Sequence, residues 1–305
     1  MVAHDQRGLH VATPALSVAR QVLVLGDALL DVHVTPARPM RPGADVPAAI
    51  RLEPGGQGAN LAVRLARRGV GVRLRCALGT DAAGAIVRSA LEAAGVAMDA
   101  VESPATGSVV VLVDRDGRRT MLSQRAPLIG PSLAADGAAW LVVSGYAVLE
   151  PDATRLATFP LPHRRAVIGC ALDDAEVQGW RTALKALEPD LLVLNEDEAA
   201  LVSGGAPEPA PALAKELDAV VVVTRAGGAT ARLGGETLHV IRDAVATVDT
   251  TGAGDAFAAA LIAELLDVTW PPSRDALEQA LLTATSVATA VTLVPGAQAR
   301  VYGER

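Results

Sequence analysis

A carboxylate directly after a glycine-rich turn is the feature of this chain best suited to do chemistry. The turn is Gly252-Ala253-Gly254, Asp255 follows it, and an apolar helical pattern continues to residue 266. Small residues in front of a helix leave its first N–H groups open to an anion, and the positive end of the helix dipole favours the same ligand. The turn therefore predicts a site for a phosphate or for developing negative charge.

Asp255 itself has two interpretations. A carboxylate repels a bound phosphate, so its place in the first helical turn fits a proton acceptor beside a phosphoryl group under attack. Asp is also a frequent helix cap, because its oxygens accept hydrogen bonds from the first N–H groups. This segment alone does not decide between a base and a cap.

A second glycine-rich helix start lies earlier in the chain. Residues 54–60 read P-G-G-Q-G-A-N, a helical pattern follows at 61–68, and Gly69 is the expected stop. The glycines give close access to the backbone, and Asn60 offers both a donor and an acceptor in the first turn. The alternative is a tight turn in which Asn60 is only the cap.

A polar cluster, N-E-D-E at 195–198, follows an expected strand at 191–194. In parallel α/β sheets, ligands bind beyond the carboxyl ends of the strands, which is where this cluster would lie. Such a cluster can hold Mg²⁺ through water, since the ion keeps several waters in nucleotide sites. The same residues also fit a capping box, with Asn195 as the cap and Glu198 three residues later.

The apolar pattern predicts the scaffold that positions these segments. Short apolar runs alternate with helical patterns, which favours an α/β fold with a mostly parallel sheet covered on both faces. Strands are expected at 21–25, 72–78, 140–143, 166–170, 191–194 and 219–224, a hairpin at 229–233 and 236–241, and helices at 61–68, 81–91 and 276–293.

Two further pairs of extended segments do not look like core strands. One pair lies near 32–52 and is broken by prolines, and the other lies near 108–123 with a turn at Asp116-Gly117. We expect them to form a small projecting sheet. Since no repeat or linker divides the chain, we predict one domain over 21–305, after a disordered tail at 1–20 that has no signal-peptide core.

Composition excludes several classes of partner. Half of the 305 residues are hydrophobic, only 2% are aromatic, and the net charge is −7. With no cationic run and few rings for stacking, nucleic acid is not an expected partner. Cys76 and Cys170 are distant thiols that fit a reducing cytoplasm, and the apolar run at 281–294 is too short and too Thr-rich to cross a membrane.

Other phosphate and hydrolase motifs are missing. Neither of the two lysines, Lys185 and Lys215, lies in a P-loop, and no V-A-I-K lysine of a protein kinase exists. The third glycine of a dinucleotide fingerprint is replaced by Phe257 in one segment and by Leu61 in the other. There is no G-x-S-x-G elbow, and the five histidines are scattered, so triads and zinc sites lack support.

Taken together, the motifs resemble those of the ribokinase-like carbohydrate kinases, also called the PfkB family, over residues 21–300. Gly26-Asp27 with Asp31 is similar to the family's first-strand substrate motif, and residues 54–60 are similar to its first signature. The N-x-x-E motif and the second signature, D-T-T-G-A-G-D-A-F at 249–257, follow in the same order. The combination favours a base over a cap for the aspartate after the turn.

The resemblance implies a three-layer αβα sandwich with a small β lid, and Mg²⁺-dependent transfer of the ATP γ-phosphoryl group to a hydroxyl of a sugar or nucleoside. Asp255 would take the hydroxyl proton, while the N–H groups of Gly252, Ala253 and Gly254 would stabilise the transferring group. The other implied site residues are Asp27, Asp31, Gly55, Gly56 and Asn60 for the substrate, Asn195, Thr224 and Gly227 for the nucleotide, Glu198 for Mg²⁺ through water, and Asp249 for a monovalent cation such as K⁺.

Three departures from the family pattern affect the expected substrate. Gln57 stands where ribose-type members often have Lys, and Ser144-Gly145-Tyr146 replaces a glutamate that they use on the sugar; both argue against ribose. The segment 224–228 is shorter than the usual T-x-G-x-x-G. This leaves the register of the nucleotide loop open, and with it the alternative of a catalytically silent binding protein on the same fold.

Two surface features complete the expectations. Arg125, just past the lid hairpin, could reach an anionic substrate group, but a solvated surface residue is the favoured interpretation. The exposed strands of the lid need cover, which predicts a homodimer formed through the lid.

Overall fold

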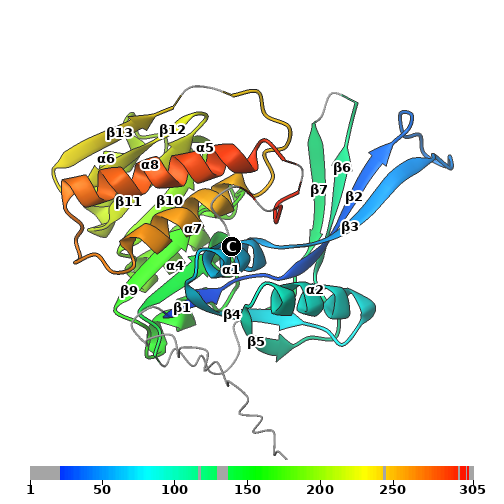
Figure 1. Ribbon diagram of the computed structural model, residues 1–305, viewed down its shortest axis with the longest axis horizontal. Coiled ribbons are helices and arrows are strands. Elements are labelled where there is room, and N and C mark those ends of the chain that lie inside the picture. The colour runs from blue at the N-terminus through cyan, green and yellow to red at the C-terminus, as the bar shows by residue number, and fades with distance from the viewer. Residues whose placement is uncertain are drawn as a thin grey trace, which may run out of the picture.

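The fold is built on two β-sheets of different size (Figure 1). The computed structural model describes residues 21–115, 118–128, 137–242, 245–294, 296–299 and 301. The expected tail at 1–20 and the expected turn at 116–117 lie outside the described residues.

The large sheet is mostly parallel, as predicted. Within the described residues it has nine strands in the order β13-β12-β11-β10-β9-β8-β1-β4-β5, and only the pairings β11–β12 and β12–β13, at one edge, are antiparallel. Its strands are β1 (Gln21–Leu25), β4 (Gly71–Leu78), β5 (Ala97–Glu102), β8 (Trp140–Ser144), β9 (Arg164–Ile168), β10 (Leu191–Asn195), β11 (Val220–Arg225), β12 (Gly228–Leu233) and β13 (Glu236–Ile241).

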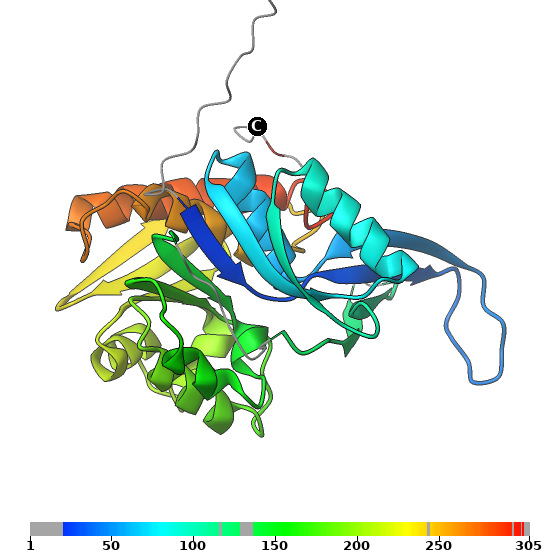
Figure 2. The same cartoon turned by 90° about the horizontal axis from the view of Figure 1, so that it is seen from below.

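Helices cover both faces of this sheet, so the chain forms three layers (Figure 2). Side chains alternate along β1, where Val22 and Val24 join one apolar cluster and Leu23 and Leu25 join the other. The first cluster includes α1 (Gln57–Arg67), α2 (Ala82–Ala93), α7 (Ala253–Leu265) and α8 (Arg274–Val291), and the second includes α3 (Gly145–Val148), the 3₁₀ helix η2 (Ala153–Thr158), α4 (Val177–Leu187), α5 (Glu196–Val202) and α6 (Pro209–Leu217).

The small sheet projects from one side of the molecule and matches the expected lid (Figure 1). Its order is β3-β2-β6-β7, with β2 (Leu29–Pro36), β3 (Ala48–Gly55), β6 (Ser108–Val113) and β7 (Arg119–Gln124). Strand β2 begins shortly after β1, and β3 leads directly into α1. The lid therefore connects to both segments that carry the expected substrate residues.

Some boundaries differ from those predicted. Helix α1 begins at Gln57 rather than 61, because Gly56 is the N-cap and the following residues are already helical. The strand expected at 166–170 ends at Ile168, and β5, at the edge of the large sheet, was not predicted. No helix in the described part of the chain is both long and apolar enough to cross a membrane.

Candidate active site

The glycine-rich turn begins α7 with the conformation that only glycine adopts easily. Gly252 is the N-cap, with a φ of 74°, and a Cβ there would lie 2.9 Å from the backbone of Ala297. No side chain caps α7, so the alternative in which Asp255 is a cap is wrong. The Asp255 carboxylate instead accepts a hydrogen bond of 2.9 Å from Nδ2 of Asn60 in α1.

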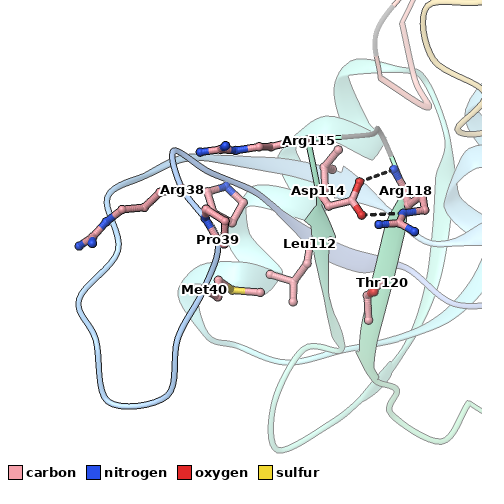
Figure 3. Close-up of a pocket in the computed structure, with 10 residues that line it drawn as sticks. Arg38, Pro39, Met40, Leu112, Asp114, Arg115, Arg118 and Thr120 are labelled. Atoms are coloured by element: carbon pink, nitrogen blue, oxygen red, sulfur yellow. Dashed lines mark hydrogen bonds and ion pairs between the residues drawn. The ribbon is translucent and has the colours of Figure 1, made fainter.

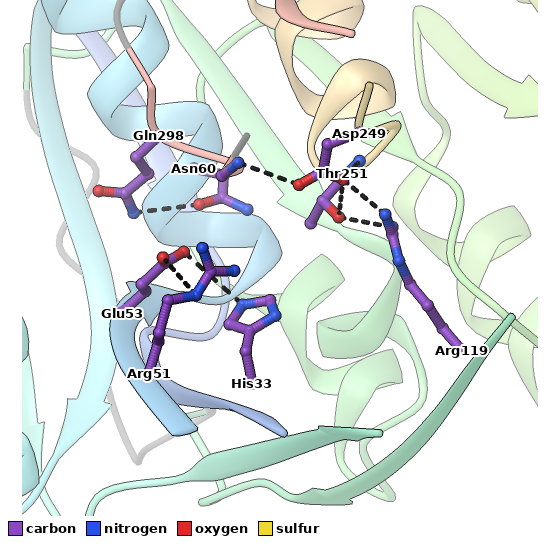
Figure 4. A network of polar contacts seen from close by, with 9 residues as sticks. His33, Arg51, Glu53, Asn60, Arg119, Asp249, Thr251 and Gln298 are labelled. Atoms are coloured by element: carbon purple, nitrogen blue, oxygen red, sulfur yellow. Dashed lines mark hydrogen bonds and ion pairs between the residues drawn. The ribbon is translucent and has the colours of Figure 1, made fainter. Parts of the chain in front are cut away.

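Two amides, those of Gln298 and Asn60, fix the orientation of this carboxylate, and Figure 4 shows how the two amides lie. Asn60 is buried, and its Oδ1 accepts a hydrogen bond of 3.0 Å from Nε2 of Gln298 near the C-terminus. The Asn60 amide can therefore present only its NH₂ group to Asp255. Both glycine-rich helix starts thus meet at one point, where Asn60 of α1 contacts Asp255 of α7.

Two carboxylates at this point have unusual protonation equilibria. Burial raises the pKa of Asp255 to about 7, against the lowering effect of the Asn60 hydrogen bond. Burial also raises the pKa of Asp31 to about 7, with further contributions from the negative charges of Asp27 and Glu53. A carboxylate whose pKa lies near neutrality is well matched to the work of a general base.

The turn separates two cavities. The first, about 240 Å³, has Thr251, Gly252 and Asp255 on its wall together with the inner face of the lid. The second, also about 240 Å³, has Thr250, Ala253 and Gly254 on its wall. Asp255 thus faces only the first space. We name this space the acceptor cavity, for the expected phosphoryl acceptor, and the second space the donor cavity, for the expected phosphoryl donor.

The predicted substrate residues gather at the acceptor cavity. Asp27, Asp31, Gly56 and Asn60 line it. Gly55 lies just behind, where a Cβ would be 2.1 Å from Oδ2 of Asp31, so only glycine lets that carboxylate approach the backbone.

Arg125 is exposed, as expected, but it also lies on the wall of the acceptor cavity and is paired there. Its Nε donates a hydrogen bond of 3.0 Å to Oδ2 of Asp27, a side chain that is only 5% exposed. Its guanidinium also lies 3.6 Å from the ring centroid of Tyr146. The charge of Arg125 is therefore already engaged by protein groups at the cavity wall.

Gln57 lines the acceptor cavity, but its polar atoms serve the scaffold. Its Oε1 accepts hydrogen bonds of 2.6 Å from Ser144 Oγ and 2.9 Å from the N–H of Gly145, and its Nε2 donates to the carbonyl of Gly169. The two departures from the ribose-type pattern, at Gln57 and at 144–146, are thus in direct contact with each other.

The predicted nucleotide residues fall into two groups. Thr224 and Gly227 line the donor cavity, where β11 and β12 form a tight hairpin in which Arg225 pairs with Gly228. Asn195 lies beside Thr224 in the neighbouring strand but is not on the wall of either cavity. The hairpin sets the register of the short loop that the sequence left open.

Asn195 and Glu198 form the capping box that the sequence offered as an alternative. Asn195 Oδ1 accepts from the N–H of Glu198 at 2.8 Å, and Glu198 Oε2 accepts from the N–H of Asn195 at 2.9 Å. Burial raises the pKa of Glu198. In the described residues Oε1 of Glu198 accepts no hydrogen bond, so this oxygen is available to a water of hydrated Mg²⁺. Within the same residues, no group of three Asp, Glu, His or Cys side chains could hold a metal ion directly.

Asp249 is held by a residue that the sequence did not single out. Arg119, the first residue of β7 in the lid, donates 2.6 Å from Nη2 to Asp249 Oδ1 and 2.5 Å from Nη1 to Thr251 Oγ1 (Figure 4). The sequence signal that could have identified Arg119 is its two-residue spacing from Met121, because residues two apart on a strand lie on the same face of the sheet. Both residues line the acceptor cavity. His33 and Tyr146 on the same wall, and Gln298 behind Asn60, were likewise not given a role.

Comparison with known proteins assigns this geometry to a family. A model of the pfkB family carbohydrate kinases matches residues 19–301. The chain belongs to the PfkB family of carbohydrate kinases. Members of this family are phosphotransferases that act on hydroxyl groups, so the chain is a sugar kinase of the PfkB type.

The proteins similar to this PfkB kinase have names that differ in the acceptor. A fructokinase of Salmonella typhimurium is 30% identical over 301 residues, covering 91% of this chain and 94% of the relative. Solved structures with the same fold include a ribokinase of Thermotoga maritima (22% identity, TM-score 0.74, covering 91% and 94% of the two chains) and an adenosine kinase of Sinorhizobium meliloti (21%, 0.75, 93% and 97%). A fructokinase of Xylella fastidiosa with bound ATP is also similar (19%, 0.75, 92% and 94%).

Proposed function

We propose that this PfkB kinase transfers the γ-phosphoryl group of ATP to a hydroxyl of a free sugar or sugar derivative, with Asp255 as the catalytic base. The observation that carries the proposal is the turn at 250–255, which has one cavity on each side and the Asp255 carboxylate on the acceptor side only. An acceptor hydroxyl and a triphosphate that approach from opposite sides would meet at the open N–H groups of α7.

In this mechanism Asp255 takes the proton of the acceptor hydroxyl as that oxygen bonds to phosphorus and the bond to the ADP oxygen breaks. Asn60 holds the carboxylate toward the acceptor cavity. The N–H groups of Gly252, Ala253 and Gly254 stabilise the charge on the transferring group, because a preorganised amide turn needs no reorganisation. Thr224 and Gly227 bind the nucleotide, and Asp27, Asp31, Gly55, Gly56 and Asn60 hold or shape the acceptor.

We assign magnesium to the start of α5, at the end of β10 and beside strand β11. Glu198 would hold it through water, with its carboxylate fixed by the hydrogen bond that Oε2 accepts from the N–H of Asn195. The ion, when bound, neutralises charge on the phosphate oxygens of the nucleotide. This arrangement fits the small number of acidic groups, since Mg²⁺ in nucleotide sites relies mainly on phosphates and water.

A free sugar is the first candidate for the acceptor, because of the similarity to fructokinases over nearly the whole chain. A nucleoside is the second. Its support is a further cavity of about 490 Å³, which shares Asp27, Met121, Arg125 and Tyr146 with the acceptor cavity and gives room for a base.

A panel assay tests the proposal. ADP formation is measured with MgATP and a series of ketohexoses, aldoses, sugar acids and nucleosides. We expect turnover with a free sugar, fructose first among them. Preference for adenosine or another nucleoside would shift the assignment to the second candidate, and ligand binding without any ADP formation would favour the silent binding protein.

The outer face of the lid suggests a homodimer. The register of the lid sheet places seven apolar side chains on the face opposite the acceptor cavity. They are Val32, Val34, Ile50, Leu52, Val110, Leu112 and Leu122. Ile50, Leu52 and Leu122 are 63%, 54% and 60% exposed, so a second copy of the chain would remove substantial apolar surface from water.

A hollow at the lid tip adjoins this face. Its volume is about 310 Å³, and its walls include Met40, Leu112 and Arg115 (Figure 3). It gives an apolar recess with a basic rim in which side chains of a second copy can pack.

We also assign the enzyme to the cytoplasm, where its two buried free thiols, Cys76 and Cys170, would stay reduced.

A further inference from the structure

The carboxylate of Asp249 is the residue that the family resemblance assigns to a monovalent cation, and its surroundings do not fit one. Oδ1 accepts from Arg119 Nη2 at 2.6 Å, from the N–H of Thr251 at 2.9 Å and from Thr251 Oγ1 at 2.6 Å. Oδ2 accepts from the N–H of Gly296 at 3.0 Å. Oδ1 is therefore fully engaged by three donors, while Oδ2 has one donor.

The charge at this point is also already balanced. A guanidinium is always protonated, and its short contact with Asp249 is a charge-assisted hydrogen bond. A cation bound to the same oxygen would lie only a few ångströms from this positive charge. Consistent with strong stabilisation of the ionised form, the hydrogen bonds from Thr251 and Gly296 hold the pKa of Asp249 far below its usual range, despite its partial burial.

We infer that the Arg119 guanidinium takes the place of a monovalent cation at Asp249 and makes phosphoryl transfer independent of K⁺. The inference rests on the proposed function. Because Arg119 belongs to lid strand β7 and also bonds Thr251 in the phosphate-binding turn, it joins the lid to the turn beside Asp255. Arg119 is a positioning residue in this scheme: it holds 249–252 in the shape that presents the N–H groups of α7.

The test compares two salts of equal ionic strength, KCl and tetramethylammonium chloride, on the full-length protein. The native enzyme is expected to have the same kcat/KM in both. Arg119→Met is expected to lose about 10–100-fold in tetramethylammonium, as for a removed charge-assisted pair, and to regain most of that rate in K⁺. Arg119→Lys keeps the charge and is expected to stay independent of K⁺.

Thermal unfolding gives a readout that does not require activity. K⁺ is expected to raise the unfolding midpoint of Arg119→Met above that in tetramethylammonium, but not that of the native protein or of the double variant Arg119→Met/Asp249→Asn. Arg118→Met, which removes the neighbouring arginine that pairs with Asp114, is the matched control and should respond to K⁺ as the native protein does.

Two results would overturn the inference. One is a native enzyme whose rate collapses without K⁺. The other is an Arg119→Met protein whose rate and midpoint are both indifferent to K⁺, since Asp249 would then accept no cation for Arg119 to replace. A protein that phosphorylates nothing in either salt would instead refute the proposed function, while the midpoints would still decide the role of Arg119.

Discussion

At the scale of single residues, the chemistry depends on two carboxyl groups whose pKa values lie near 7. Asp255 and Asp31 both line the acceptor cavity, and burial raises the pKa of each to about 7. They differ in their partners, because Asp255 is oriented by a hydrogen bond from Asn60 while Asp31 lies against the backbone of Gly55. Only Asp255 is also beside the N–H groups of α7, which is why the base is assigned to it.

The pH dependence of turnover follows from this pKa. Asp255 accepts a proton only when ionised, so kcat/KM for the acceptor is expected to fall as the pH drops through about 7 and to reach a plateau above it. Asn60→Ala removes a hydrogen bond that favours the ionised form, so the acid limb of its profile should move to higher pH. A profile of Asn60→Ala shifted to lower pH would contradict this account.

The raised pKa of Asp31 leads to a prediction about the stability of the fold. Its pKa is raised from 3.8 to about 7, so the folded state binds the proton more tightly than the unfolded chain. The ionised carboxylate therefore costs stability that increases as the pH rises between these values. Asp31→Asn is expected to raise the unfolding midpoint more at about pH 8 than at about pH 5. An equal or opposite effect at the two pH values, measured by calorimetry, would argue against this burial cost.

Asp255 and Asn60 could be picked out from the sequence because each lies within a few residues of the glycines that mark it. Asp255 and Asn60 each follow a glycine-rich start to a helix, and that pattern is visible without a structure. The pairing of Arg125 with Asp27 and of Arg119 with Asp249 could not be predicted in this way. Each joins residues more than 90 positions apart, and the sequence alone cannot tell a paired arginine from a solvated one.

At the scale of elements, the start of α7 depends on the conformation of Gly252. Gly252→Ala is expected to destabilise the fold by roughly 1–3 kcal/mol, because its φ of 74° is strained for alanine and its Cβ would meet Ala297. Gly254→Ala is the matched comparison for stability, since nothing lies within 4 Å of its Cβ. Chemical denaturation that gives equal losses for the two variants would contradict the geometry.

The elements themselves were predictable where their pattern was strong. The parallel strands and the lid hairpin agree with expectation because each is a short apolar or alternating run bounded by turn residues. Edge strand β5 was missed because the segment Ala97–Glu102 is half-exposed and carries two acidic residues. The start of α1 was placed too late because three glycines, which usually break helices, lie near it, and one of them, Gly58, is already helical.

For the whole molecule, the two faces of the lid differ in character. Its inner face closes the acceptor cavity and its outer face is apolar and exposed. Ile50→Glu together with Leu122→Glu is expected to convert a dimer to a monomer in sedimentation experiments, because charges would be placed in the apolar contact. Ile241→Glu is the control, since Ile241 is 80% exposed on β13, away from the lid, and should leave the mass unchanged. A native protein that is monomeric at high concentration would exclude the dimer.

Replacement of Asp255 by Asn tests the central claim most directly. The amide keeps the size of the side chain and can still accept from Asn60, but it cannot take a proton from a hydroxyl. We expect kcat to fall by about 10²–10⁴-fold or more while the Kd values for acceptor and ATP, measured by calorimetry, change little. A variant that retains native kcat would contradict the account, because the turn and its carboxylate would then not be where phosphoryl transfer takes place.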